Sequence, residues 1–365
     1  MPGPEPPIQI EEIAHGPEPI EGVATSTAAI LGETATGPTA PTEVCSLEDF
    51  QRLFGGGLGL VADAVAGFFG NGGRRAVIAR VVPAQPGPAT AADYEAGLAA
   101  LTDADAALVY APDALATPGL AEALIAHCEH LGDRFAVLDA PRDGDPLGPR
   151  AAWDTRYGAY YHPWLEVADP ATGGTRLVPP GGHVLGVYAR VDTERGVFRA
   201  PANEVVRGVV GVAQQVTDAE QDVLNPAGVN TIRAFPGRGI RVWGARTLSS
   251  DPEWKYVSVR RLFIFLERSI DRGVQWVVFE PNGERLWAQV RDTIRQFLRA
   301  QWLAGALQGR TETEAFFVRC DRTTMTQDDL EAGRLICEIG VAPLKPAEFV
   351  IFRIGQWTAD HRPPP

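Results

Sequence analysis

The sequence contains few of the residues that form zinc sites or disulfide frameworks. It has 365 residues but only four cysteines and six histidines. Cys45, Cys128, Cys320 and Cys337 are widely and irregularly spaced, without a CxxC motif or a Cys/His cluster. Zinc sites need closely spaced ligands, and disulfide-stapled domains are much richer in cysteine. We therefore expect reduced thiols, no metal and no cofactor.

The sequence also lacks a long apolar run and an excess of basic charge. Its most apolar stretch, 58–70, contains Asp63 and three glycines and is too short to span a bilayer. The first 22 residues are acidic and proline-rich, unlike a secretory signal. The net charge of −13 argues against general binding to nucleic acid or to an anionic membrane. We expect neither nucleic acid nor a membrane as a partner.

The first half of the chain alternates between strand and helix patterns after a buried strand in 22–34. This βαβαβ order favours a parallel sheet with right-handed crossovers. A further strand is expected at 157–167, followed by a hairpin or looped insert and a helix at 183–196. The alternating elements are strands at 75–82, 107–113 and 135–141 and helices at 90–103 and 117–132.

The second half has the pattern of an α+β domain. An amphipathic helix is predicted at 257–273, and a long helix at 282–309, capped by Asn282 and closed by Gly309. Strands are predicted at 240–248, 274–281, 315–321 and 334–344.

Both ends of the chain carry short apolar strands that are separated from the body by proline or glycine. An isolated strand is unstable in water, so each must join a sheet in its own subunit or in a neighbour. The predicted strands contain Ile8 and Ile10 at one end and Phe349, Val350, Ile351, Phe352, Arg353 and Ile354 at the other.

The stretch FPGRGIRVWG, from Phe235, has the glycines of a nucleotide loop in the wrong context. A dinucleotide-binding loop follows a strand and opens a helix, and a Walker A loop requires GK[ST]. Here the glycines precede a strand. They are better explained by a tight turn.

Long stretches of the sequence resemble contractile tail sheath proteins of phages, R-type pyocins and extracellular contractile injection systems. The segment from NPAGVNTIRAFPGRG to FLERSI (225–270) resembles the C-terminal domain of that family. GGHVLGVYARVDTERGVF, from Gly181, resembles its subtilisin-like domain. FEPNGERLWAQV and FFVRCDRTTMTQ continue the match, which covers about 20–357. The short length, without a large outer insertion, is similar to pyocin and injection-system sheaths.

The resemblance implies a fold of α/β plus α+β class. A non-catalytic, subtilisin-like parallel-sheet domain would be followed by an α+β sheath domain near the tube, with an extended β-strand arm at each end. The implied units are an N-terminal arm (1–21), the α/β domain (22–227), the C-terminal domain (228–345) and a C-terminal arm (346–365).

The resemblance also implies a structural function. Subunits would assemble with one another as six-fold rings or a six-start helix around an inner tube, with baseplate and cap proteins at the ends. Arms would pair with the C-terminal domains of neighbours, and contraction would drive the tube through a target envelope. Assembly would take place in the bacterial cytoplasm, and the particle would remain there or be released by lysis.

Arg291, Arg295 and Arg299 fall on one face of the predicted helix 282–309. Such a stripe is commonly a solvated face beside a core face. In related sheaths a helix of the C-terminal domain contacts the tube through charge, so the resemblance implies a candidate tube contact here.

The sequence leaves two alternative functions. A subtilisin-fold hydrolase would need a Ser-His-Asp constellation, for which His183, Asp192 and Asp139 are the candidates, but no nucleophile motif of the GTS or GxSxG type is present. We therefore expect no enzymatic activity. A tube or baseplate component of the same machine is the second alternative, although such chains are usually smaller or lack this two-domain order.

Overall fold

The computed structural model describes residues 19–55 and 59–348. The predicted arm residues lie outside the described part of the chain: Ile8, Ile10, Phe349, Val350, Ile351, Phe352, Arg353 and Ile354.

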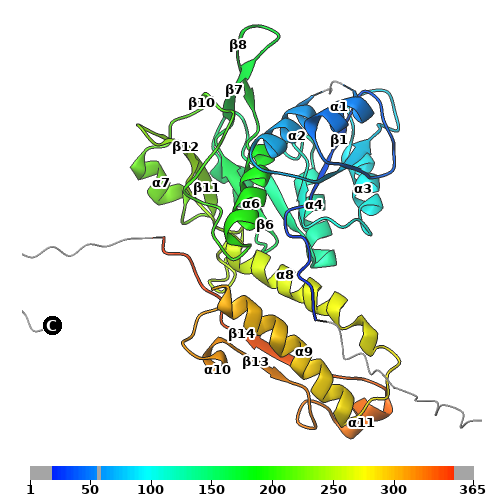
Figure 1. Ribbon diagram of the computed structural model, residues 1–365. Coiled ribbons are helices and arrows are strands. Elements are labelled where there is room, and N and C mark those ends of the chain that lie inside the picture. Colours follow the sequence, from blue (N-terminus) through cyan, green and yellow to red (C-terminus); the bar gives the residue numbers. More distant parts are fainter. Residues whose placement is uncertain (1–18, 56–58, 349–365) are drawn as a thin grey trace, which may run out of the picture.

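A nine-stranded sheet dominates the upper part of the molecule in Figure 1, in the order β2-β3-β1-β4-β5-β6-β11-β12-β9. The strands from β3 to β11 are parallel, whereas β2, β12 and β9 add to the edges in antiparallel fashion. The parallel sheet that the alternating pattern predicts is therefore confirmed. The strands are β1 (Ala28–Glu33), β2 (Thr42–Val44), β3 (Ala76–Val81), β4 (Leu108–Tyr110), β5 (Phe135–Asp139), β6 (Gly158–His162), β9 (Glu204–Val205), β11 (Val229–Phe235) and β12 (Gly239–Val242).

Helices cover both faces of this sheet and enclose two apolar cores. On one face α2 and α6 pack with α1, and on the other face α3 and α4 pack. Central strands such as β5 are buried along their whole length, which is why they are continuously apolar. The helices are α1 (Leu47–Phe54), α2 (Leu60–Gly70), α3 (Ala91–Ala100), α4 (Leu120–Leu131), the short α5 (Leu147–Arg150), α6 (Gly181–Arg195) and α7 (Asp218–Leu224).

Glycines allow α2 and α6 to approach each other closely. A Cβ atom on Gly182 would lie 2.4 Å from the backbone of Ala64, and one on Gly186 would lie 2.4 Å from the carbonyl oxygen of Phe68. The prediction that 183–196 forms a tightly packed helix is thus confirmed.

The strand predicted at 157–167 is two strands. Pro163, which has no N–H group to donate to a ladder, separates β6 from β7 (Leu165–Asp169). β7 leaves the large sheet and forms a separate three-stranded sheet with β8 (Gly174–Val178) and β10 (Gly211–Val212). This sheet is the projection at the top of Figure 1 and contains the expected hairpin.

The glycine-rich stretch FPGRG forms the hairpin turn between β11 and β12. Gly237 and Gly239 have φ angles of 70° and 77°, in the region that favours glycine. The N–H of Arg238 donates to the carbonyl oxygen of Phe235 over 3.0 Å. The interpretation as a tight turn is confirmed. The predicted strand 240–248 is shorter than expected, because β12 ends at Val242.

The lower unit in Figure 1 is an α+β layer that α8 joins to the large sheet. α9 covers one face of the two-stranded antiparallel sheet β13–β14, and their apolar side chains share a third core. The elements are α8 (Val257–Gly273), the 3₁₀ turn η1 (Gln275–Val277), α9 (Glu284–Leu303), α10 (Glu312–Ala315), β13 (Phe316–Arg319), α11 (Gln327–Glu331) and β14 (Glu338–Val341).

Two predictions for this region are wrong. The apolar segment 274–281 is not a strand. Among the described residues it has no strand to pair with, and after η1 the chain turns at Phe279, whose φ is 72°. The long helix begins after Gly283 and ends near Gly305, which has a φ of 84°. Asn282 instead accepts a hydrogen bond from Trp287 Nε1 over 2.7 Å.

The boundary expected between 227 and 228 stays a prediction. β11 and β12 follow that boundary in sequence, and they are hydrogen bonded within the large sheet through β6.

Candidate assembly surfaces

A buried ion pair joins α8 to α6 behind the chain that leads into β1. Arg261 Nη2 lies 2.6 Å from Asp192 Oδ2, and the two side chains are 3% and 4% exposed. The same guanidinium donates to the carbonyl oxygen of Thr25 over 2.9 Å and lies over the ring of Tyr188. The buried charges are therefore paired and hydrogen bonded, as burial requires.

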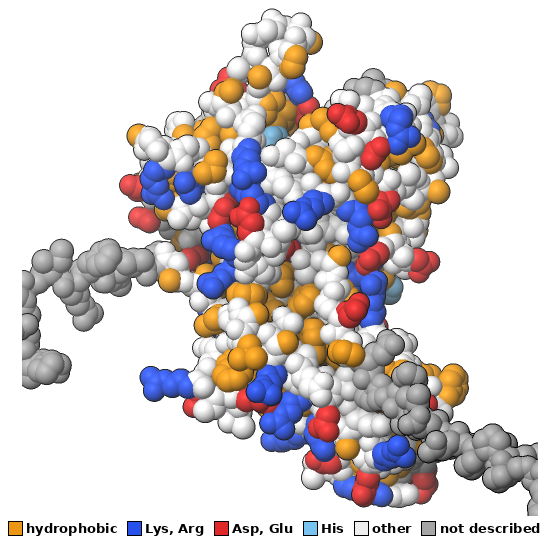
Figure 2. Space-filling model, in the orientation of Figure 1, with side chains coloured by type: hydrophobic (Ala, Val, Ile, Leu, Met, Phe, Trp, Pro, Cys, Tyr) orange, Lys and Arg blue, Asp and Glu red, His pale blue; other side chains and the backbone are white. Residues whose placement is uncertain are grey.

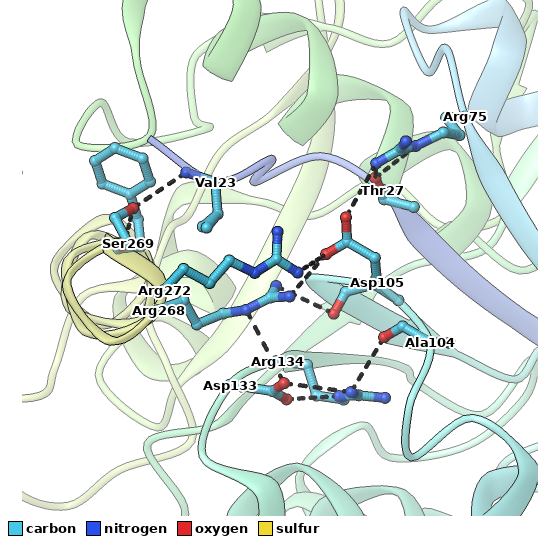
Figure 3. Close-up of polar contacts among 12 residues, drawn as sticks. Val23, Thr27, Arg75, Ala104, Asp105, Asp133, Arg134, Arg268, Ser269 and Arg272 are labelled. Carbon is cyan, nitrogen blue, oxygen red and sulfur yellow. Dashed lines mark hydrogen bonds and ion pairs between the residues drawn. The ribbon is translucent and has the colours of Figure 1, made fainter. Parts of the chain in front are cut away.

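A second ionic cluster ties α8 to the loop before β4 (Figure 3). Arg268 and Arg272 donate to Asp105 Oδ1 over 2.8 and 3.0 Å, and Arg75 approaches the other carboxylate oxygen. Burial raises the pKa of Asp105, but the charges of Arg272 and Arg268 outweigh it and lower the pKa. Asp133 extends the cluster towards Arg134. These contacts fix the orientation of α8 relative to the sheet.

The described chain begins beside the C-terminal end of α8. Ile20 is buried and packs against Gly273, where a Cβ atom would lie 2.5 Å from the Ile20 side chain. The N–H of Val23 donates to Ser269 Oγ over 3.1 Å (Figure 3). The end of the predicted N-terminal arm, at Ile20, and the residues that follow it are thus held at a defined place.

The last described residue, Glu348, is anchored by several donors. Arg246 donates to its two carboxylate oxygens over 2.6 and 2.8 Å, and Lys255 Nζ lies 3.1 Å away. Tyr256 and Asn225 also donate to this carboxylate. Burial opposes ionisation, but these hydrogen bonds and charges lower the pKa of Glu348 to about 2.

A cavity of about 610 Å³ lies next to this anchor. Its wall joins α7, the segment after β12 and residues 346–348, and it includes Gln221, Trp243 and Pro346. The described start of the predicted C-terminal arm, residues 346–348, therefore lines this cavity.

Sequence reasoning missed this anchor. A glutamate three residues after Lys345 resembles any solvated charge, and its partners, Arg246 and Asn225, are about 100 residues away. The sequence feature that could have pointed to the anchor is Pro346, which marks where the compact domain ends.

The predicted arginine stripe lies on the exposed face of α9. The side chains of Arg291, Arg295 and Arg299 are 38%, 59% and 63% exposed. Arg295 pairs with Glu312 of α10, and Arg299 Nε lies 3.9 Å from the same carboxylate. Acidic and basic side chains accordingly mix over this part of the surface in Figure 2. The opposite face of α9 is apolar and buried, as predicted.

The small sheet β13–β14 exposes several apolar side chains. Phe317 is 47% exposed, and its ring lies over Gly340 of the opposing strand. Ile339 and Leu344 are also exposed. Within the described residues each of these strands pairs only with the other, so both sheet edges carry free backbone groups.

The candidate catalytic residues do not form a triad. Asp192 is engaged by Arg261, and Asp139 accepts hydrogen bonds from Tyr110 Oη over 2.5 Å and from the N–H of Gly181 over 2.7 Å. His183 packs against Gly67, and burial lowers its pKa to about 4. Among the described residues no hydrogen bond joins His183 to either carboxylate.

The described residues contain neither a metal-binding cluster nor a membrane-spanning helix. In 19–55 and 59–348, no group of three or more His, Cys, Asp or Glu side chains is arranged to hold a metal ion. Within the same ranges, no helix combines the length and the apolar character that a bilayer crossing needs.

Comparison with known proteins identifies the family. The model of the phage tail sheath protein central domain matches residues 87–248, and that of the phage tail sheath C-terminal domain matches 249–356. Together they cover most of the chain. The chain belongs to the phage tail sheath protein family.

Individual relatives match over nearly the whole chain. A putative prophage major tail sheath protein of Pseudomonas aeruginosa is 26% identical in an alignment of length 351 that covers 88% of this chain and 88% of that one. A chain of the sheath complex of PVC, an extracellular contractile injection system solved in the contracted state, aligns with a TM-score of 0.83 and 30% identity over 99% of this chain and 100% of that one. A chain of the anti-feeding prophage baseplate, 6-fold symmetrised, aligns with a TM-score of 0.80 and 33% identity. The alignment covers 98% of this chain and 100% of that one.

Proposed function

We propose that the chain is the structural subunit of a contractile sheath. Copies polymerise as six-fold rings or a six-start helix around an inner tube, and contraction of this polymer drives the tube through a target envelope. The observation that carries the proposal is the end-to-end similarity to a chain of the PVC sheath complex in the contracted state. Baseplate and cap proteins terminate the polymer.

The terminal arms link the subunits in this proposal. The strand around Ile8 and Ile10 and the strand Phe349–Ile354 pair with the small sheet of a neighbour, whose edges have unpaired N–H and C=O groups. Alternating apolar residues set the register of the added strands. The anchors at Ile20 and Glu348 support this role, because they hold the base of each arm on the subunit.

The subunit performs mechanical work without catalysis. In this proposal the large sheet domain is the non-catalytic, subtilisin-like domain that the resemblance implies, and its candidate acid and base groups have structural roles. An extended lattice that is metastable relative to the contracted one releases free energy at many interfaces together. No nucleotide is hydrolysed by this chain. Assembly takes place in the bacterial cytoplasm, and the particle then stays there or is released by lysis.

Electron microscopy of negatively stained particles tests the function. We expect hollow, striated cylinders from the purified full-length chain, or sleeves around a thinner tube when it is co-expressed with the products of neighbouring genes. Monodisperse globular particles in both preparations would contradict the proposal.

A further inference from the structure

The small sheet places Cys320 and Cys337 opposite each other, although they form no CxxC motif in the sequence. Cys320 directly follows β13 and Cys337 directly precedes β14. The register of the sheet pairs Arg319 with Glu338. Because the strands are antiparallel, the next pair in this register is Cys320 and Cys337.

The hydrogen-bond pattern identifies the kind of pair they form. The N–H of Ala342 donates to the carbonyl oxygen of Ala315 over 2.8 Å, which marks 315 and 342 as a hydrogen-bonded pair. Such pairs alternate with non-hydrogen-bonded pairs, so the pair at 320 and 337 is of the second kind. Cα atoms of such a pair lie about 4.5 Å apart, within the roughly 4.4–6.8 Å that a disulfide spans.

The two thiols share one environment. Both side chains belong to the core between α9 and the sheet, where Cys320 is fully buried and Cys337 partly buried. Interaction with the Cys337 thiol lowers the pKa of Cys320; burial opposes this change, and the charge of Arg291 adds to it. A depression of about 360 Å³ bordered by Trp287, Arg291 and Cys320 leads to this place from the solvent.

We propose that Cys320 and Cys337 are an oxidisable pair that closes to an intramolecular disulfide by exchange with a low-molecular-weight disulfide. One cysteine thiolate attacks a sulfur of the small disulfide, and a small thiol leaves. The thiolate of the other cysteine then attacks the protein sulfur of this mixed disulfide, and the second small thiol leaves. The two protein thiols are oxidised, and the small disulfide is reduced to two thiols that take up the two protons.

The bond would staple the segment 321–336, which contains α11, across the end of the sheet. A cross-link that closes a loop of this length stabilises a protein by restricting its unfolded chain. One consequence rests on the proposed function. If arms of neighbouring subunits add to β13–β14, the disulfide would give them a sheet whose two strands are held together at one end.

The test uses the full-length chain under native conditions, with oxidised glutathione as the small disulfide. After oxidation the free thiols are blocked in acid, and the chain is digested and analysed by mass spectrometry without reduction. We expect one linked peptide pair containing Cys320 and Cys337, a mass lower by two hydrogen atoms, and a thermal midpoint raised by about 3 °C or more. The reductant dithiothreitol should reverse all three changes.

Matched variants separate this pair from the other cysteines. Cys337→Ser should abolish the linked peptide and the shift in midpoint, whereas Cys45→Ser, which removes an exposed cysteine of the sheet domain, should leave both unchanged. If Cys320 and Cys337 remain free, or if either one forms only lasting glutathione adducts or bonds between chains, the proposal is overturned. None of these outcomes requires a polymer, so failure here would leave the proposed function standing.

Discussion

At the scale of single residues, the structure uses its buried charges to hold the subunit together. Arg261 and Asp192 are almost completely buried yet mutually satisfied, and Glu348 is surrounded by donors. From the sequence alone, Asp192 is only a candidate member of a catalytic Ser-His-Asp triad. Its true partner lies 69 residues away on α8, a distance that no local pattern predicts.

Glu348 provides a prediction about pH. Its pKa falls from 4.5 in the unfolded chain to about 2 in the folded protein. A depressed folded pKa contributes stability above the unfolded value, and this contribution is lost as pH falls towards the folded value. We expect Glu348→Gln to lower the free energy of unfolding by about 2 kcal/mol at neutral pH, and the difference from the unaltered protein to shrink progressively below about pH 4.5.

Urea unfolding of both proteins across this pH range measures the effect. Glu95→Gln, at an exposed position of α3, is the control and should behave like the unaltered protein. A difference between Glu348→Gln and the unaltered protein that is independent of pH would show that the carboxylate is not the anchor.

At the scale of elements, periodicity predicted the parts that are amphipathic or continuously buried. The parallel sheet, the helix 257–273, the buried face of α9 and strand β13 were all predictable. The segment 274–281 was not, because a short apolar run does not reveal whether a partner strand exists. β11 was missed because its polar residues Asn230 and Thr231 are buried through hydrogen bonds that only the fold supplies.

The arginine stripe of α9 provides a prediction about tube binding. Arg295 is exposed, and its acidic partner is Glu312. Because an exposed side chain contributes little to the core, Arg295→Glu should leave the fold intact. The substitution reverses a charge on the proposed contact surface. We expect co-sedimentation with the inner tube protein to weaken at least about tenfold, since like charges at an interface are repulsive.

Arg52→Glu is a matched control for this variant. Arg52 is an exposed arginine with an acidic partner on α1 of the sheet domain, 67% exposed and 2.7 Å from Asp49. The Arg52→Glu variant should bind the inner tube protein as the unaltered chain does. Unaltered tube binding by Arg295→Glu would remove the stripe from the proposed contact.

At the scale of the whole molecule, the two domains are joined by contacts that the sequence did not locate. The boundary expected at 227/228 precedes β11 and β12, which belong to the large sheet, whereas the two family models meet between 248 and 249. We therefore propose a boundary near 248, before α8. The segment 225–270, which resembles the C-terminal domain of the family, begins with β11 and β12. Only the pairing of these strands shows that they belong to the large sheet.

The central claim is that terminal arms connect subunits into a polymer. Its most direct test compares the full-length chain with chains that lack 1–18 or 349–365, using electron microscopy and sedimentation under the conditions in which the full-length chain assembles. The cuts leave the anchors at Ile20 and Glu348 in place, so we expect both truncated chains to fold and to unfold at nearly the same temperature as the full-length protein. We predict that neither forms continuous striated cylinders. Cylinders of normal length and connectivity from either truncated chain would contradict the account.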